Sequence, residues 1–327
     1  MPQPPMRPHR QRGDYEPDAA ARVPKSTPPD WQHAVEAFLQ DARTRECSPA
    51  TVDNYRTYLL GARAEQFLTD YKIRSVADIT ADKLRDFRAE LVDAGLSIGT
   101  VATFHRILRN FLGFCRRQRW EVGADTLDIA PPLQTAMEPE TYTEAEEQRI
   151  LDATRTSRDR FLVEFMVRTG LRLNEVALVT IDDVVRAPEG SYLRVGSREE
   201  RKDRIVPLDT GTYRLSTKLD SYLRNVRPAG AKDGHLFLTT RRDPLTKEFG
   251  PLEAQGIKML LRRIGQETGI HVHAQKFRNT FARRALTAGV DSLVLQRALG
   301  HSTLAMVNRY AQLQPRDLVD AWRARRD

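Results

Sequence analysis

The sequence close to the C-terminus reads Leu299-Gly300-His301, and Tyr310 follows nine residues after the histidine. Arg278 stands twenty-three residues before His301, within the stretch Phe277-Arg278-Asn279-Thr280-Phe281-Ala282. A second arginine, Arg172, ends the run Thr169-Gly170-Leu171-Arg172. Each motif is weak alone, but two arginines, a histidine and a tyrosine in this order and spacing form a strong combined signal.

The chemistry of these four side chains explains why they occur together. Two guanidinium groups can each hold phosphate oxygens through pairs of parallel hydrogen bonds. A phenol can attack phosphorus and keep the broken strand as a covalent ester. Because the arginines supply the positive charge, we expect no metal ion and no other cofactor. The arrangement resembles the active site of the tyrosine recombinases, also called phage integrases.

This resemblance implies a role for each residue. Arg172 and Arg278 clamp the scissile phosphate, His301 hydrogen-bonds it, and Tyr310 is the nucleophile that forms a 3′-phosphotyrosyl link. Glu175 follows Arg172 by three residues, so a helix starting here places both on one face. Its carboxylate is then expected to hold Arg172 in position.

The chain departs from the family pattern before Arg278. The usual motif is His-x-x-Arg followed by His or Arg, whereas this chain has Gln275 at the histidine position. Glutamine can donate a hydrogen bond to a phosphate oxygen but cannot accept a proton at neutral pH. His271 and His273 lie just upstream, but neither has the three-residue spacing to Arg278.

A charged turn, Gly196 to Arg204, carries a second departure. Members of the family place a lysine here that donates a proton to the departing 5′ oxygen. The only lysine of this turn is Lys202, which also aligns with a second, non-catalytic lysine of the family. Arg198 is the other candidate, although an arginine hardly gives up its proton. A solvated turn without a catalytic role is the third interpretation.

Composition agrees with a DNA partner without requiring one. The 327 residues carry 52 basic and 44 acidic side chains, a formal charge of +8, which favours a polyanion. The two cysteines, Cys47 and Cys115, have no metal-type spacing and suit a reducing cytoplasm. No apolar run approaches the roughly 20 residues of a membrane span, so we expect a cytoplasmic protein.

The N-terminal third predicts a tail followed by a helical domain. Residues 1–29 hold eight of the eighteen prolines and are expected to be a disordered tail, either a solvated leader or a DNA-touching arm. Residues 30–120 predict four helices, the second opening with Ser48 as N-cap and including Phe67. This unit resembles the core-binding, SAM-like domain of the same family.

The fourth predicted helix is the clearest. Val101, Phe104, Leu108, Phe111 and Cys115 recur at alternating spacings of three and four, which is typical of a buried stripe. The opposite face is basic, and either solvent or the DNA backbone can be its neighbour. The arginines that we predict to contact DNA are Arg106, Arg109, Arg116 and Arg117.

Residues 121–142, punctuated by glycine and proline, predict a linker. Residues 143–327 predict a catalytic domain with a β-hairpin of Tyr192–Val195 and Arg204–Leu208, a third strand at Leu236–Leu238, and a C-terminal tail helix. The tail helix has one apolar face and either caps its own domain or docks on a neighbouring subunit. Its apolar residues are Leu318, Val319 and Trp322.

The fold class that follows is mainly α with a small β-sheet, in two domains that clamp DNA. The resemblance implies a site-specific recombinase that integrates, excises or resolves DNA, acting as a homo-tetramer on a double-stranded site, with or without a second recombinase. Two alternatives stay open. One is a DNA-binding partner subunit with weak or no cleavage, and the other is a monomeric relaxing enzyme like the type IB topoisomerases.

Overall fold

The computed structural model describes residues 30–123, 125–132, 138–196, 204–301, 303–308 and 310. The chain divides into two compact units, Met1–Thr135 and Ala136–Asp327. The division falls inside the linker that the sequence predicts at 121–142. The expected N-terminal tail, Lys202 and Arg198 of the charged turn, and the C-terminal tail helix all lie outside the described residues.

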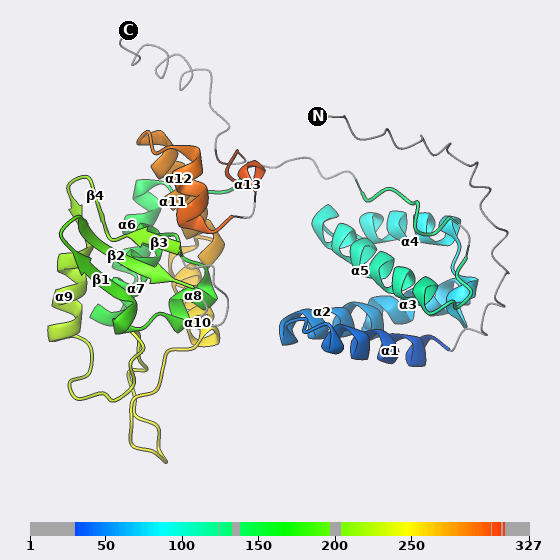
Figure 1. Cartoon of the computed structure of the whole chain (residues 1–327), viewed down its shortest axis with the longest axis horizontal. Coiled ribbons are helices and arrows are strands. Elements are labelled where there is room, and N and C mark those ends of the chain that lie inside the picture. The colour runs from blue at the N-terminus through cyan, green and yellow to red at the C-terminus, as the bar shows by residue number, and fades with distance from the viewer. Residues whose placement is uncertain are drawn as a thin grey trace, which may run out of the picture. The chain divides into compact units, whose positions relative to one another are not determined.

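The first unit is helical (Figure 1). Each long helix has a side-chain N-cap, as at Ser48, whose hydroxyl accepts a hydrogen bond from the backbone of Thr51. Helix α1 packs on α2 and α5, and α4 packs on α5. The helices of this unit are α1 Trp31–Thr44, α2 Pro49–Leu60, α3 Ala62–Asp70, the 3-10 helix η1 Val76–Asp78, α4 Ala81–Asp93 and α5 Ile98–Arg117.

The second helix expected from the sequence is divided in two at Gly61. This residue has an extended backbone and serves both as the C-cap of α2 and as the N-cap of α3. A Cβ at Gly61 would lie 2.3 Å from the carbonyl oxygen of Thr57. The chain therefore turns where only a glycine fits, and Phe67 reaches the core from a separate helix.

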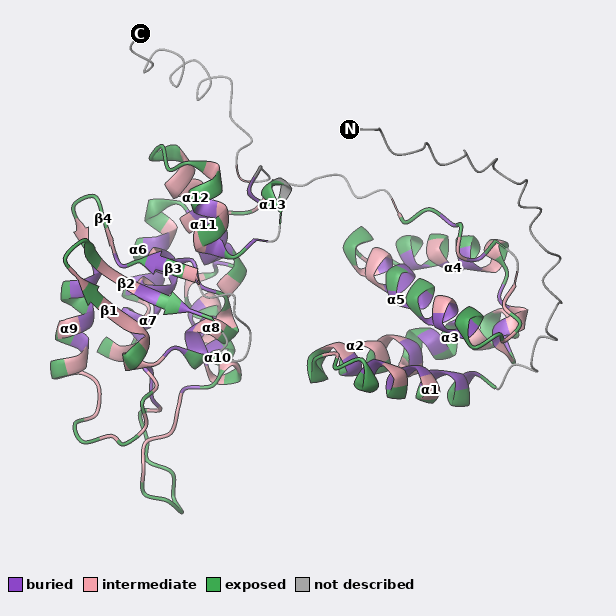
Figure 2. Ribbon diagram, in the orientation of Figure 1, coloured by how far each residue is buried: buried purple, intermediate pink, exposed green. Residues whose placement is uncertain are grey.

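The predicted stripe of α5 is confirmed. All five of its members are buried, and Phe111 packs edge-on against Trp31 and Phe38 with ring centroids 5.0 and 5.7 Å apart. Figure 2 shows this burial on the inward side of α5. The four arginines predicted to contact DNA are all exposed on the same helix: Arg106, Arg109, Arg116 and Arg117.

The second unit places a three-stranded antiparallel sheet, ordered β1-β2-β3, against helices (Figure 1). Its strands are β1 Val184–Ala187, β2 Gly190–Val195 and β3 Arg204–Pro207, and Val195 pairs with Arg204. The predicted hairpin is confirmed. Two short strands, β4 Asp209–Thr210 and β5 Tyr213–Arg214, form a separate pair.

The third strand expected at Leu236–Leu238 is wrong. All three residues are buried, but the segment forms only isolated bridges, at His235 with Thr180 and at Leu238 with Pro251. The strand that joins the hairpin is β1 instead. Leu236–Leu238 is apolar because it crosses the core, where Phe237 packs edge-on against Phe165.

The remaining helices complete the second unit and form its C-terminal part. Helix α7 lies against α9 and α11, and α12 lies against α11 and β3. The helices are α6 Glu144–Asp152, α7 Ser157–Thr169, α8 Leu173–Leu178, the 3-10 helix η2 Ile181–Asp183, α9 Leu215–Asn225, α10 Ala254–Thr268, α11 Ala274–Thr287, α12 Ser292–Leu299 and α13 Leu304–Asn308. Within the described ranges, no helix is both long and apolar enough to cross a membrane.

Candidate active site

Arg172 is positioned by a tight turn between α7 and α8. Helix α7 ends at Gly170, which adopts a left-handed conformation with φ +61°, and Arg172 is the N-cap of α8. A Cβ at Gly170 would lie 2.4 Å from Cδ1 of Phe281. Both the backbone conformation and the close approach of α11 therefore require glycine immediately before Arg172.

Glu175 holds two arginines. Its Oε2 accepts hydrogen bonds from the Arg172 backbone N–H at 2.6 Å and from Nη2 of Arg204 at 2.7 Å. Its Oε1 accepts from Nη1 of Arg172 at 3.0 Å. Burial opposes ionisation of this carboxyl, but the hydrogen bonds from Arg204 and Arg172 keep its pKa below the usual range. The charged carboxylate thus fixes both guanidinium groups.

Arg278 projects from α11 into the interior beside Arg172. Only 2% of it is exposed, and its guanidinium donates to the carbonyl of Gly170 at 2.8 Å and to the carbonyl of Leu299. Burial, followed by the charge of Arg172, lowers the pKa of Arg278 to about 10, so it remains charged at pH 7. Arg172 binds the adjacent carbonyl of Gly300 through Nη2 at 3.1 Å.

His301 and Tyr310 lie at the same end of α12. Gly300 ends this helix in a left-handed conformation, and His301 follows directly. The rings of His301 and Tyr310 are nearly parallel, at 20° with centroids 6.0 Å apart. Tyr310 also packs against a small apolar cluster that includes Leu299 and Val307.

Two amide side chains complete the surroundings of Tyr310. Its hydroxyl donates to Oδ1 of Asn279 at 3.3 Å, and Nε2 of Gln275 donates to the same oxygen at 3.0 Å. Nδ2 of Asn279 donates to the carbonyl of Glu140 at 3.1 Å. Gln275 therefore reaches the tyrosine through Asn279, one helical turn further along α11.

The structure brings five of the six predicted catalytic residues into this one network, and the sixth, Lys202, falls in the undescribed turn. The arginines predicted to contact DNA belong to the other compact unit. Two guanidinium groups bound to one carboxylate, with the charge of a third beside them, are suited to holding an additional anion. The residues gathered are Arg172, Gln275, Arg278, His301 and Tyr310.

Comparisons with known proteins agree with this geometry. Residues 140–316 match the phage integrase family, and residues 35–119 match the SAM-like N-terminal domain of phage integrases. The tyrosine recombinase XerC of Actinobacillus succinogenes is 30% identical over 299 residues, covering 89% of this chain and 96% of that protein. This chain belongs to the phage integrase family. It is a tyrosine recombinase.

Solved structures show the same fold at lower identity. A lambda integrase dimer bound to a COC′ core site has a TM-score of 0.67 and 16% identity, covering 87% of this recombinase and 77% of that chain. A lambda integrase tetramer bound to a Holliday junction has a TM-score of 0.65 and 16% identity, and the match covers 89% of this recombinase and 83% of that chain.

Two residues of the recombinase site were not identified from the sequence. Asn279 directly follows Arg278, where the family usually has His or Arg, and this departure was a usable signal. Arg204 closes the charged turn and is 12% exposed, with Nε donating to the carbonyl of Ala298 at 2.8 Å. Nothing in the sequence of that turn distinguishes Arg204 from the other charged residues of the turn.

Proposed function

We propose that this recombinase cuts and rejoins double-stranded DNA at a specific site through a 3′-phosphotyrosyl ester on Tyr310. The observation that carries the proposal is the convergence of Arg172 and Arg278 on the carbonyls that precede His301. Both guanidinium groups are thereby fixed beside His301 and Tyr310, the histidine and tyrosine that the sequence motifs predict. No part of this arrangement needs a metal ion to supply positive charge.

In the proposed step the phenolic oxygen of Tyr310 attacks phosphorus, the phenolic proton is released to solvent water, and the bond from phosphorus to the 5′ oxygen breaks. Arg172 and Arg278 stabilise the charge that develops on the phosphoryl oxygens, with hydrogen bonds from His301 and Gln275. A proton must reach the departing 5′ oxygen, and we assign its donor to Lys202 or Arg198. Reversal by a 5′ hydroxyl of the partner duplex reseals the strand and frees Tyr310.

We further propose that the exposed arginines of α5 bind the DNA backbone from the first unit. Exposed guanidinium groups repeated along one helix suit successive phosphates. These contacts do not predict the base sequence of the target site, because phosphate contacts position a protein on DNA but carry no sequence information. The arginines concerned are Arg106, Arg109, Arg116 and Arg117.

We propose a homo-tetramer on DNA, with or without a second recombinase. An apolar groove of about 750 Å³ is lined by Ile205, Val290, Val294 and Ala298, among others. The tail residues Leu318, Val319 and Trp322, which lie outside the described residues, offer apolar surface to fill it in a neighbouring subunit. A reducing cytoplasm suits the two unpaired cysteines, Cys47 and Cys115.

A partner subunit with weak cleavage is the second candidate. It is favoured by Gln275, an amide in place of a histidine that exchanges protons near pH 7, and by Asn279, an amide in place of a histidine or an arginine. In that case the recombinase supplies architecture, and another tyrosine recombinase supplies most of the cleavage.

Covalent capture tests the first candidate. A nicked suicide substrate of the cognate site should yield a protease-sensitive protein–DNA adduct, and excess EDTA should leave its yield unchanged. Tyr310→Phe keeps the ring but lacks the attacking oxygen, so this variant should bind DNA and form no adduct. A normal adduct yield from Tyr310→Phe would refute the assignment of the nucleophile.

Mixing experiments separate the two candidates. If Tyr310→Phe protein supports full recombination beside a second recombinase, this chain is an architectural partner. If recombination is lost in proportion to the fraction of Tyr310→Phe protein, the chain cleaves DNA itself.

A further inference from the structure

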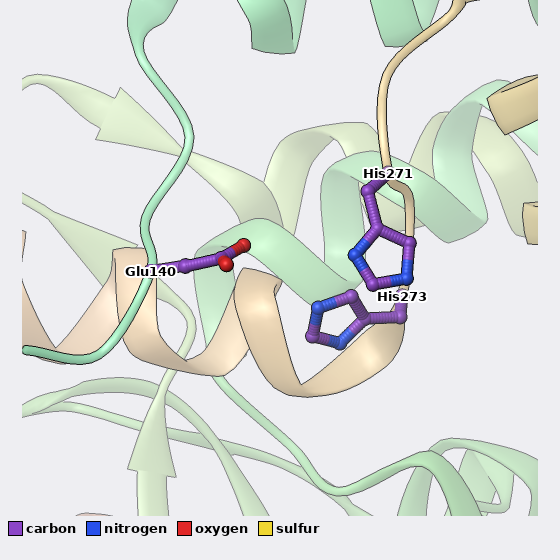
Figure 3. Close-up of side chains that lie close together, drawn as sticks. All are labelled: Glu140, His271 and His273. Carbon is purple, nitrogen blue, oxygen red and sulfur yellow. The ribbon is translucent and has the colours of Figure 1, made fainter. Parts of the chain in front are cut away.

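Three potential metal ligands meet on the catalytic unit, outside the network around Tyr310. Glu140 comes from the segment that precedes α6, and His271 and His273 come from the segment that precedes α11. One ligand atom from each residue lies within 4.8 Å of those of the other two. Figure 3 shows the carboxylate and the two imidazole rings facing a shared space.

The backbone that carries these side chains is held on both sides. The hydroxyl of Tyr142 accepts a hydrogen bond from the His273 backbone N–H at 3.0 Å and donates to the carbonyl of His271 at 3.1 Å. The Tyr142 ring packs on Phe277, with centroids 4.8 Å apart. On the other side, the carbonyl of Glu140 accepts from Asn279. The two segments are therefore positioned before any ligand arrives.

We propose that Glu140, His271 and His273 form a binding site for a borderline divalent cation, with Zn²⁺ as the reference ion. Two imidazoles and a carboxylate are a ligand set that Zn²⁺ accepts, with water in the fourth position. The site lies beside the catalytic network, takes no part in the proposed cleavage and does not depend on it.

Only small movements are needed to close the site. Ligand atoms around one Zn²⁺ at bond lengths of 2.0–2.2 Å lie about 3.3–3.6 Å apart in tetrahedral geometry. The Glu140 side chain is 66% exposed, so it can rotate toward the rings when it leaves its 3.7 Å ion pair with Lys276. His273 accepts a 3.3 Å hydrogen bond from the Lys276 backbone as N-cap of α11, and coordination gives up this long bond.

Lys276 opposes the ion and so provides a sensitive test. Its ammonium lies 3.7 Å from Glu140, 4.0 Å from Glu146 and 4.6 Å from the centroid of the Tyr142 ring. A bound cation would repel this charge and compete with it for the Glu140 carboxylate. Removing the ammonium should therefore tighten metal binding, an effect opposite to that of removing a ligand.

The bound ion would act as a cross-link. It would join the segment that enters the catalytic unit to the N-terminus of α11, the helix that carries Arg278. A ligand that binds only the folded state raises the unfolding temperature in proportion to the logarithm of its concentration. We therefore expect Zn²⁺ to raise the unfolding temperature of the whole chain.

The test measures Zn²⁺ binding to the full-length, untagged chain at pH 7.5 by competition with a chromophoric chelator, together with the unfolding temperature. We expect the wild-type chain to bind one equivalent of Zn²⁺. The affinity for Zn²⁺ should fall at least tenfold in each of the variants Glu140→Gln, His271→Ala and His273→Asn. Asparagine can still cap α11, so His273→Asn removes the ligand and keeps the cap. Lys276→Met should bind Zn²⁺ more tightly than the wild type.

The matched control is His33→Ala in the other unit, because His33 also pairs with a carboxylate, that of Asp30, at 2.7 Å. This variant should bind Zn²⁺ as the wild type does. Stoichiometric binding that survives all three ligand substitutions overturns the proposal, as does no binding by the wild type. Neither result bears on the cleavage assay with Tyr310→Phe. The proposal of a Zn²⁺ site can therefore fail while the proposal of cleavage by Tyr310 stands.

Discussion

At the scale of single residues, the two arginines of the site differ in a way that can be tested. Arg172 is partly exposed and Arg278 is buried, yet both are assigned to the same phosphate. Replacing either by alanine removes one preorganised anion-stabilising donor, which costs on the order of 10²–10³ in rate. DNA affinity should fall much less, because many other phosphate contacts remain.

Single-turnover cleavage and DNA binding of Arg172→Ala and Arg278→Ala measure this difference. Arg278→Ala also leaves the buried carbonyl of Gly170 without its hydrogen-bond donor, which can lower the stability of the fold. Arg278→Lys keeps a donor at this position and is therefore measured beside it. Lysine keeps the charge but cannot form paired hydrogen bonds, so its rate should also fall. Wild-type cleavage in both alanine variants would place the active site elsewhere.

Gln275 gives a prediction about pH. Gln275→His restores a group that exchanges protons near neutral pH, so cleavage should stay equal or rise. Its pH profile should gain a titration near the ordinary imidazole pKa, about 6.5. Gln275→Ala should lose only a neutral hydrogen bond, about 0.5–1.5 kcal/mol. A pH profile of Gln275→His identical to that of the wild type would mean that position 275 does not face the reacting groups.

The sequence predicted that Arg172, Arg278, His301 and Tyr310 act together, because charge and nucleophilicity restrict which residue types can serve, and the structure places these four side chains in one network. The sequence marks Asn279 as a departure from the family pattern, but it does not predict the contact of Asn279 with Tyr310. An amide has no characteristic chemistry, and its contact with Tyr310 joins residues 31 positions apart. Such a contact depends on where Tyr310, which follows α13, lies against α11, and no local pattern encodes that placement.

At the scale of secondary-structure elements, the turn between α7 and α8 depends on one glycine. Gly170→Ala puts a Cβ into a left-handed backbone, which costs roughly 1–2 kcal/mol. The clash with Phe281 adds overpacking of about 1–3 kcal/mol. Gly289→Ala is the matched control, because Gly289 has φ +83° with no atom within 4 Å of its added Cβ.

Urea unfolding of both variants separates the two contributions. Gly170→Ala should lose more stability than Gly289→Ala, and the difference reports the contact between α7 and α11. An equal loss in the two variants would mean that Phe281 moves aside without cost and that the contact does not position Arg172.

Helices with a strong apolar period, such as α5, could be predicted almost to their ends. The exceptions have local physical causes. Gly61 divides a helix because the Cβ of any other residue would collide with the preceding turn. Leu236–Leu238 looks like a strand because it is buried, but burial alone does not create a pairing partner. β1 was missed because three of its four residues are only partly buried and Arg186 is exposed.

At the scale of the whole molecule, we propose that the first unit mainly holds DNA and that the second unit reacts with it. The family match covers both units, residues 35–119 and 140–316. The catalytic network belongs to the second unit, whereas the exposed arginine face of α5 belongs to the first. Binding and cleavage should therefore respond separately to substitutions in the two units.

The salt dependence of DNA binding tests this division. Each phosphate neutralised on B-DNA contributes about −0.9 to the slope of log K against log salt concentration. Replacing the four α5 arginines by alanine should therefore make the slope less steep by up to about 3.6. The quadruple variant should still form the Tyr310 adduct when DNA is supplied at saturating concentration. The four arginines are Arg106, Arg109, Arg116 and Arg117.

A control with the same change in net charge shows whether position or charge matters. Four other exposed cations of the first unit, on or beside α1 and α3, can be replaced by alanine together. If α5 faces DNA, this control should change the slope by clearly less than the α5 variant does. Equal changes would show only a general electrostatic attraction, and an unchanged slope in the α5 variant would exclude α5 from the interface. The control positions are Arg43, Arg63, Lys72 and Arg74.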